Sequence, residues 1–304
     1  MNQSFRRFAV ASVVSPLAVF ATVACTIVSS PAGPTPDPDA ASPEDASPTA
    51  DATTSDVVPA DTSVASSCDA PVGPPPASLG FDRFYVKYLD ADGLPVIGSN
   101  KVSDAAVRQA CRIARKMLSF RADVRAQMKV HGARLSVMSR AEVTTDVPEH
   151  ADLYTAFPGT DWNTRARGLG GTVARPATSC AEENVLCDAK EPYVGENILV
   201  HELSHGMVNL GVVFADKTFQ RRLDDAFAKA VAAGKWKDTY AGSNVEEYFA
   251  EGVQSYFDTN IQAVPANGIH NEVNTRPELL AYDPVLHGLV AEVFGPAVWT
   301  PACP

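Results

Sequence analysis

The chain has 304 residues and a formal net charge of −11, and its charges are unevenly distributed. Residues 26–78 contain 11 of the 23 prolines and eight acidic residues but no lysine or arginine, so residues 79–304 keep 23 basic and 28 acidic residues and a net charge of only −5. No segment has the lysine- and arginine-rich stripe typical of nucleic-acid-binding proteins, so the composition argues against a nucleic-acid partner. About 225 residues suffice for one domain with a substantial hydrophobic core.

The first 25 residues have the features of an export signal. Residues 1–7 are basic, and residues 8–24 are apolar apart from two serines and a threonine. This arrangement is typical of a signal peptide, and Pro16 and the short apolar run argue against a permanent membrane anchor. The sequence Thr22-Val23-Ala24-Cys25 resembles a bacterial lipobox, although Leu or Val is usual where Thr22 stands. We therefore predict an exported protein that is either anchored to the cell envelope through a lipid on Cys25 or secreted after ordinary cleavage.

Residues 26–78 have the composition of a spacer. They are rich in Pro, Ala, Ser, Thr and Asp and contain almost no large apolar side chains. Such a segment buries too little surface to offset the entropy of ordering, so we expect a disordered tether that its prolines keep extended. The folded domain is then expected to span residues 79–304.

The first half of this domain predicts both strands and helices. In chain order we expect a strand at 84–89, a turn at 90–93, a helix from 103 to about 120, a shorter helix at 122–129 and a strand at 134–138. Residues 141–192 resemble a loop. The glycine run at 168–171 lacks the lysine of a phosphate-binding loop, and we interpret it as an irregular edge strand or a tight turn.

The second half of the domain predicts a run of helices. They are expected at 193–210, with Pro192 near the first turn, and at 218–233, 245–257 and 277–294, the last broken or kinked at Asp283-Pro284. Two or three strands followed by helices indicate an α+β fold, with a small mixed sheet and a helical C-terminal part.

Export would place the cysteines in a compartment where disulfides persist. Cys180 and Cys187 are close together in the loop-like segment, so we expect them to pair. Cys111 lies on a predicted helix and is expected to be a buried thiol, which would leave Cys68 and Cys303 to join the two ends of the domain. A zinc site built on cysteine is the alternative, but the sequence contains no Cys-x-x-Cys spacing.

The predicted helix at 193–210 carries the pattern His-Glu-x-x-His at residues 201–205. Because His201 and His205 are four residues apart, they project from one face of the helix, close enough to bind a single zinc ion. Glu202 lies beside them, where a carboxylate can accept a proton from water at the metal. This spacing predicts a catalytic zinc site that still needs a third protein ligand.

The third ligand is expected from the helix at 245–257. Glu247 and Glu251 are one turn apart on it, so one can bind the metal while the other hydrogen-bonds a ligating histidine. Glu246 points about 100° away from Glu247 and should be solvated. The aromatic neighbours of this segment indicate a largely buried helix, in which unpaired carboxylates would be costly.

The two segments together, His201 to His205 and Tyr240 to Glu251, resemble the gluzincin metallopeptidases, and most closely the catalytic domain of anthrax toxin lethal factor and its relatives. The body also looks like a set of uncharacterised secreted proteins with the same core. The resemblance implies a zincin-like fold, Zn²⁺ bound by His201, His205 and Glu247, and Glu251 as the hydrogen-bonding partner behind them. It also implies that Tyr240 stabilises the oxyanion. It covers roughly residues 193–260, a minority of the chain.

The function that follows is hydrolysis of peptide bonds by a zinc-activated water, with Glu202 as general base and a peptide or protein as substrate. We expect a monomeric endopeptidase that meets the membrane only through its N-terminal lipid. A zinc-binding envelope scaffold or binding protein without turnover is the alternative. It would need neither Glu202 nor Tyr240, and structural zinc is normally closed by four protein ligands. His270 is interpreted as structural.

Overall fold

The sheet at the centre of the fold has five strands in the order β1-β2-β3-β5-β4. The structure is a computed structural model that describes residues 67–303; the predicted signal peptide, Cys25 and residues 26–66 of the predicted tether lie outside this range. The strands are β1 (Lys87–Ala91), β2 (Leu94–Gly98), β3 (Arg134–Met138), β4 (Gly168–Leu169) and β5 (Ala177–Ala181). The sheet is mixed, because β2, β3 and β5 run parallel while β1 and β4 are antiparallel to their neighbours.

The first strand begins three residues later and ends two residues later than the predicted strand at 84–89. A turn at Asp82 occupies the beginning of that range, since the Tyr85 amide donates to the Asp82 carbonyl, and β1 therefore starts at Lys87. The turn between β1 and β2 consists of Asp92 and Gly93, which have φ angles of 54° and 100°. Two successive positive φ values are those of the tight hairpin turn that Asp-Gly favours.

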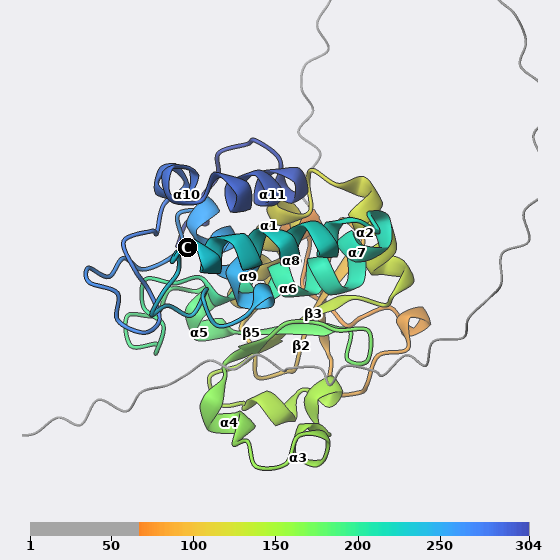
Figure 1. Ribbon diagram of the computed structural model, residues 1–304. Coiled ribbons are helices and arrows are strands. Elements are labelled where there is room, and N and C mark those ends of the chain that lie inside the picture. Colours follow the sequence, from red (N-terminus) through yellow and green to blue (C-terminus); the bar gives the residue numbers. More distant parts are fainter. Residues whose placement is uncertain (1–66, 304) are drawn as a thin grey trace, which may run out of the picture. The chain divides into compact units, whose positions relative to one another are not determined.

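Two helices lie between β2 and β3. Helix α1 (Asp104–Met117) begins where Ser103 accepts a hydrogen bond from the Ala106 amide, and α2 (Ala122–Val130) follows, as predicted. The buried face of α1 contacts β1 and β2. Figure 1 shows the long helices on one side of the sheet and the short helices α3 (Leu153–Ala156) and α4 (Trp162–Arg165) on the other.

The prediction that residues 141–192 form a loop is wrong. Besides α3 and α4, this segment contains three short elements, the 3-10 turns η3 (Thr144–Asp146) and η4 (Pro148–His150) and the helix α5 (Glu182–Val185). It also contains β4 and β5. Strand β5 pairs with β3 on one side and β4 on the other, and all five of its residues are buried. The glycine run does supply the edge strand β4, as expected.

The helix predicted at 193–210 starts later and ends differently. Helix α6 (Ile198–Met207) begins at Asn197, whose side chain accepts from the Val200 amide; residues 193–196 form a turn, so Pro192 is not part of the helix. The helix continues as the π-helical segment η5 (Val208–Val212) and ends in α7 (Val213–Ala215). By length and composition Ile198–Ala215 could cross a membrane, but 72% of it is buried, as in the core helix of a soluble protein.

Four further helices complete the C-terminal part, as predicted. They are α8 (Phe219–Ala232), α9 (Val245–Tyr256), α10 (Arg276–Tyr282) and α11 (Pro284–Phe294). The predicted break at Asp283-Pro284 separates α10 from α11. Asp283 is buried there, where it caps the Leu286 amide and accepts hydrogen bonds from the Trp236 indole and the Tyr248 hydroxyl. Helix α9 packs against α6, which places the two predicted ligand segments side by side.

The disulfide pairing differs from the prediction. Cys68 pairs with Cys111 and Cys187 with Cys303, while Cys180 is the free cysteine of residues 67–303. The expected Cys180–Cys187 bond is absent because Cys180 lies on β5 and is fully buried, whereas Cys187 follows α5 and is exposed. Cys111 is buried as a disulfide rather than as a thiol.

The folded domain begins earlier in the sequence than predicted, and the Cys68–Cys111 bond joins this first segment to α1. Residues 67–78, which their composition assigned to the tether, include the 3-10 turns η1 (Ser67–Asp69) and the start of η2 (Ala77–Leu79). Gly73 forms a β-bridge with Tyr88, and Arg108 donates to the Cys68 carbonyl. Composition alone therefore placed the boundary too late, because covalent and hydrogen bonds to the domain order a segment that could not order itself.

Candidate metal centre

The two histidines of the His-Glu-x-x-His motif lie together on the buried helix α6. Their Nε2 atoms are 3.2 Å apart, and the ring centroids are 4.9 Å apart. The side chains are 6% exposed for His201 and 14% for His205, so the pair faces the interior with one edge toward solvent. The helical spacing predicted this arrangement.

Glu247 on α9 completes a three-residue cluster. Its Oε2 lies 2.9 Å from Nε2 of His201 and 3.5 Å from Nε2 of His205. One ligand atom from each of the three side chains falls within 4.8 Å of the others. The cap of α9 holds Glu247 in place, since Asn244 accepts a hydrogen bond from the Glu247 amide. Two imidazoles and a carboxylate suit a divalent metal such as zinc, with a fourth position left for water or substrate.

The charges of the cluster stabilise one another without a metal. Burial alone would raise the pKa of Glu247, but His205 and His201 outweigh it and hold that pKa well below its ordinary value. Burial opposes protonation of His201, yet the carboxylate of Glu247 together with those of Glu202 and Glu251 raises its pKa to about 10. A bound cation would replace the protons that this cluster holds.

Glu202 lies beside the cluster and faces the edge strand. It is buried, and burial raises its pKa, although His201 and His205 act against this shift. A Cβ on Gly168 would lie 3.0 Å from Cγ of Glu202, so β4 runs directly against this side chain. A buried carboxylate with a raised pKa beside a metal site is suited to accept and return a proton.

Tyr240 approaches the cluster from the loop between α8 and α9. Its ring stacks on that of His201, with centroids 6.3 Å apart and planes inclined by 23°. Its hydroxyl oxygen is buried, and its backbone amide donates to the carbonyl of Ile269 at 2.8 Å. The structure thus brings Tyr240 to the site from 35 residues after His205 in the sequence.

The partners behind His201 include one residue that the sequence did not single out. Glu251 Oε1 lies 3.5 Å from Nδ1 of His201, and its Oε2 accepts a hydrogen bond from Asn260. Burial raises the pKa of Glu251 to about 7. Gln254 lies nearer, with Oε1 2.7 Å from the same Nδ1 atom. Helical spacing from Glu247 could have found Gln254, but no motif draws attention to an amide. Glu246, in contrast, is exposed as expected.

The edge strand β4 borders the cluster along α6. A Cβ on Gly170, the residue after β4, would lie 2.4 Å from Cβ of His205, so only glycine allows the chain to pass this close. Leu169, between the two glycines, packs on the opposite side with Leu153 and Trp162. Within the described residues β4 is the end of the sheet, so one side of its backbone is not paired with a strand.

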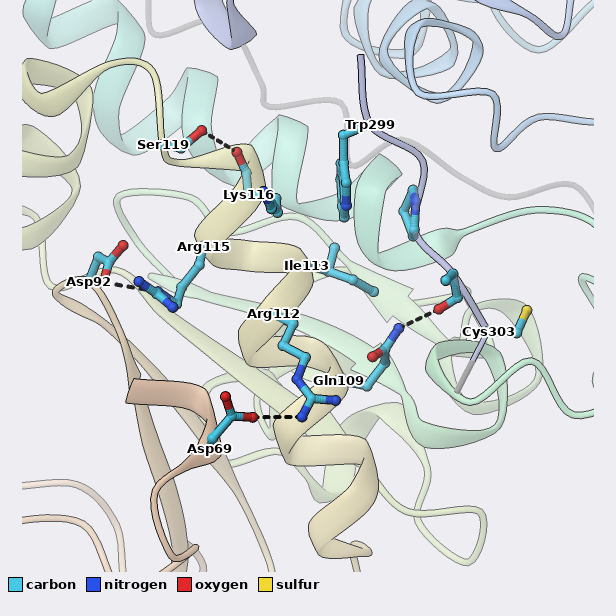
Figure 2. Close-up of a pocket in the computed structure, with 12 residues that line it drawn as sticks. Asp69, Asp92, Gln109, Arg112, Ile113, Arg115, Lys116, Ser119, Trp299 and Cys303 are labelled. Atoms are coloured by element: carbon cyan, nitrogen blue, oxygen red, sulfur yellow. Dashed lines mark hydrogen bonds and ion pairs between the residues drawn. The ribbon is translucent and has the colours of Figure 1, made fainter. Parts of the chain in front are cut away.

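A separate hollow of about 650 Å³ shares no residue with the cluster. Figure 2 shows it between α1 and the C-terminal segment that carries Trp299. Four of its charged side chains are paired with one another, Arg112 with Asp69 and Arg115 with Asp92. We interpret this hollow as a space left where α1 packs against the C-terminal segment, and not as a binding site.

Comparison with known proteins adds distant structural likeness only. No family model and no curated protein sequence matches the chain. Among solved structures, the chain is similar to the Pro-Pro endopeptidase PPEP-2 from Paenibacillus alvei, with 16% sequence identity and a TM-score of 0.44. The alignment covers 67% of this chain and 99% of that one. At this identity and TM-score the likeness carries no conclusion about chemistry.

Proposed function

We propose that the chain is a zinc-dependent peptidase whose metal is held by His201, His205 and Glu247. The observation that carries the proposal is the cluster itself, three ligand atoms within 4.8 Å of one another with the buried carboxylate of Glu202 adjacent. Three protein ligands with an open fourth position distinguish catalytic from structural zinc. The presence of Glu202 and Tyr240 also favours turnover over the scaffold alternative, which needs neither.

The residues of the chain divide the chemistry between them. When bound, zinc would supply a Lewis acid that makes water a better nucleophile at neutral pH. Glu202 accepts the proton of the attacking water and returns it to the amine nitrogen as the peptide C–N bond breaks. Tyr240 donates a hydrogen bond to the oxyanion, and a contact of this kind lowers the barrier by roughly 3 kcal/mol.

The edge strand supports a peptide as the substrate. An extended peptide can add to the free side of β4 as a further strand, which would bring its backbone past Glu202 and His205. This mode uses main-chain hydrogen bonds and fits cleavage within a chain, as in an endopeptidase. The gluzincin assignment, export, the lipid on Cys25 and a monomeric state are parts of the same proposal that rest on the sequence.

The test compares the wild-type protein with Glu202→Gln. Metal content is measured by mass spectrometry, and cleavage is measured on a diverse peptide library. We expect both proteins to bind one zinc ion and the variant to lose at least about 100-fold in activity, the lower range for loss of a general base. Glu246→Gln, an exposed neighbour of Glu247, is the matched control. Zinc-loaded wild-type protein that cleaves no peptide would favour the scaffold instead.

A further inference from the structure

His201 has two ring nitrogens, and each faces a different partner. Nε2 points to Glu247 and His205, where the metal is proposed to bind. Nδ1 faces α9, where Gln254 Oε1 lies at 2.7 Å and Glu251 Oε1 at 3.5 Å. A metal binds only a ring nitrogen that has lost its proton, so a partner that keeps a proton on Nδ1 leaves Nε2 as the nitrogen that releases its proton and binds a cation.

The amide of Gln254 can face His201 in one orientation only. On its far side, Nε2 of Gln254 lies 3.4 Å from Oε2 of Glu196. A carboxylate accepts hydrogen bonds, so Glu196 requires the NH2 end of the amide. The carbonyl end is then turned to His201, and a carbonyl oxygen can only accept. Nδ1 must therefore be the protonated nitrogen.

Glu196 is itself held from a third element. Its Oε1 lies 3.3 Å from Nε2 of His270, and both side chains are largely buried. The carbonyl of Ile269, next to His270, accepts the backbone amide of Tyr240. The loop that contains Ile269 and His270 thus bonds Tyr240 directly and contacts Glu196, which in turn contacts Gln254 beside His201.

We propose that Gln254 is a positioning residue of the metal site, which transmits the orientation imposed by Glu196 to His201 and fixes the Nδ1–H tautomer that leaves Nε2 free for zinc. The inference rests on the proposed function, because it assumes that His201 binds the metal. It differs from the sequence expectation for Glu251, whose nearer oxygen lies 3.5 Å from Nδ1, against 2.7 Å for Gln254, and whose other oxygen is engaged by Asn260. An uncharged acceptor also adds no further charge beside Glu251 and Glu196.

The test measures zinc affinity by competition with a chelator and, by nitrogen-15 NMR of the zinc-loaded protein, which ring nitrogen of His201 carries the proton, both without any peptide. Gln254→Leu removes the acceptor and should weaken zinc binding 10- to 100-fold, the range found for such supporting residues, and should mix the two tautomers. Ser255→Ala is the matched control, since Ser255 is equally buried on the same helix but its hydroxyl bonds the Val273 carbonyl and Asn260 rather than His201. It should bind zinc as the wild type does.

A second pair of variants covers the case in which Gln254→Leu does not fold. Gln254→Glu places a carboxylate against Glu196 and should weaken zinc binding, whereas the double variant Gln254→Glu/Glu196→Gln exchanges the two groups and should restore it to within about 3-fold, since the donor and the acceptor are again matched. Wild-type affinity and an unchanged tautomer in Gln254→Leu, or no rescue by the exchange, would overturn the inference. If the wild type binds zinc but cleaves no peptide, the peptidase proposal is wrong, while the positioning role of Gln254 is unaffected.

Discussion

Gly170, which directly follows the edge strand β4, and His205 of helix α6 are in such close contact that no side chain fits between them. A Cβ on residue 170 would lie 2.4 Å from Cβ of His205, a separation that real Cβ atoms essentially never show. The segment that follows β4 therefore limits where His205, a proposed metal ligand, can lie. One contact thus joins the edge of the sheet to the proposed metal site.

Gly170→Ala should therefore disturb both the fold and the site. We expect a loss of about 1–3 kcal/mol in the free energy of unfolding, the usual cost of overpacking, together with weaker zinc binding because His205 must move. Urea denaturation and chelator competition measure the two effects. Gly288→Ala on α11 is the control, because a Cβ there meets nothing within 4 Å, and it should not destabilise the protein. Equal stability of the two variants would contradict the contact.

Glu247→Gln should lower zinc affinity by at least about 100-fold, because the variant loses the charged ligand of the three. The neighbouring Glu246→Gln removes the same charge from an exposed position and should change zinc affinity by less than about 3-fold. Chelator competition at fixed pH provides the measurement. If both variants bound zinc as the wild type does, Glu247 would not be a ligand.

Tyr240→Phe should reduce kcat by about 100-fold or more while zinc content and KM stay close to those of the wild type, because its hydroxyl is proposed to act on the oxyanion alone. Steady-state kinetics on the best library peptide separate the two parameters. Tyr154→Phe removes an exposed hydroxyl that bonds Asp161 and is the control. A rise in KM with unchanged kcat would instead assign Tyr240 to substrate binding.

Buried His150 should make stability depend on pH. Its Nε2 lies 3.1 Å from the Ser179 hydroxyl, and burial lowers its pKa from 6.5 to about 4. The unfolded chain takes up this proton at higher pH than the folded protein does, so stability is full above pH 6.5 and falls as the pH drops toward 4. A shift of this size corresponds to about 3 kcal/mol. His150→Gln should remove that part of the pH dependence, which denaturation curves between pH 4 and 8 can resolve by difference from wild type.

Peptide mapping without reduction should recover Cys68 joined to Cys111 and Cys187 joined to Cys303. Cys180 should react with a thiol reagent only after denaturation, because it is fully buried and burial raises the pKa of its thiol. Cys68→Ser should cost about 2–4 kcal/mol of stability, the typical contribution of a disulfide. A Cys180–Cys187 peptide would restore the pairing expected from their proximity in the sequence.

Capping residues, apolar periodicity and proline positions predicted the elements whose ends are set by neighbouring residues in the sequence. The capped helix at Ser103, the strand at 134–138 and the break at Asp283-Pro284 follow from capping, periodicity and proline geometry. Strand β5 was missed because its residues are small and buried on both faces, so its sequence lacks the alternation of a half-exposed strand. The start of α6 was placed too early because apolar periodicity does not reveal a turn.

The site divides in the same way. His201 and His205 follow from helical spacing, and a family resemblance added Glu247 and Tyr240, which the structure brings beside them. Gln254 has no signal of its own, because its importance depends on a carboxylate from another segment, Glu196. The disulfides likewise depend on which segments meet in space. Spacing within one helix is written in the sequence, but contacts between helices are a property of the whole fold.

The bond between Cys187 and Cys303 has a consequence for how the protein is made. Cys303 follows every helix and strand of the described chain, 116 residues after its partner. During synthesis α6 and α9, with all three proposed ligands, are therefore produced before Cys187 can meet its native partner. This disulfide forms only after the segments of the metal cluster exist, and a nascent chain halted before residue 303 would lack the native partner of Cys187.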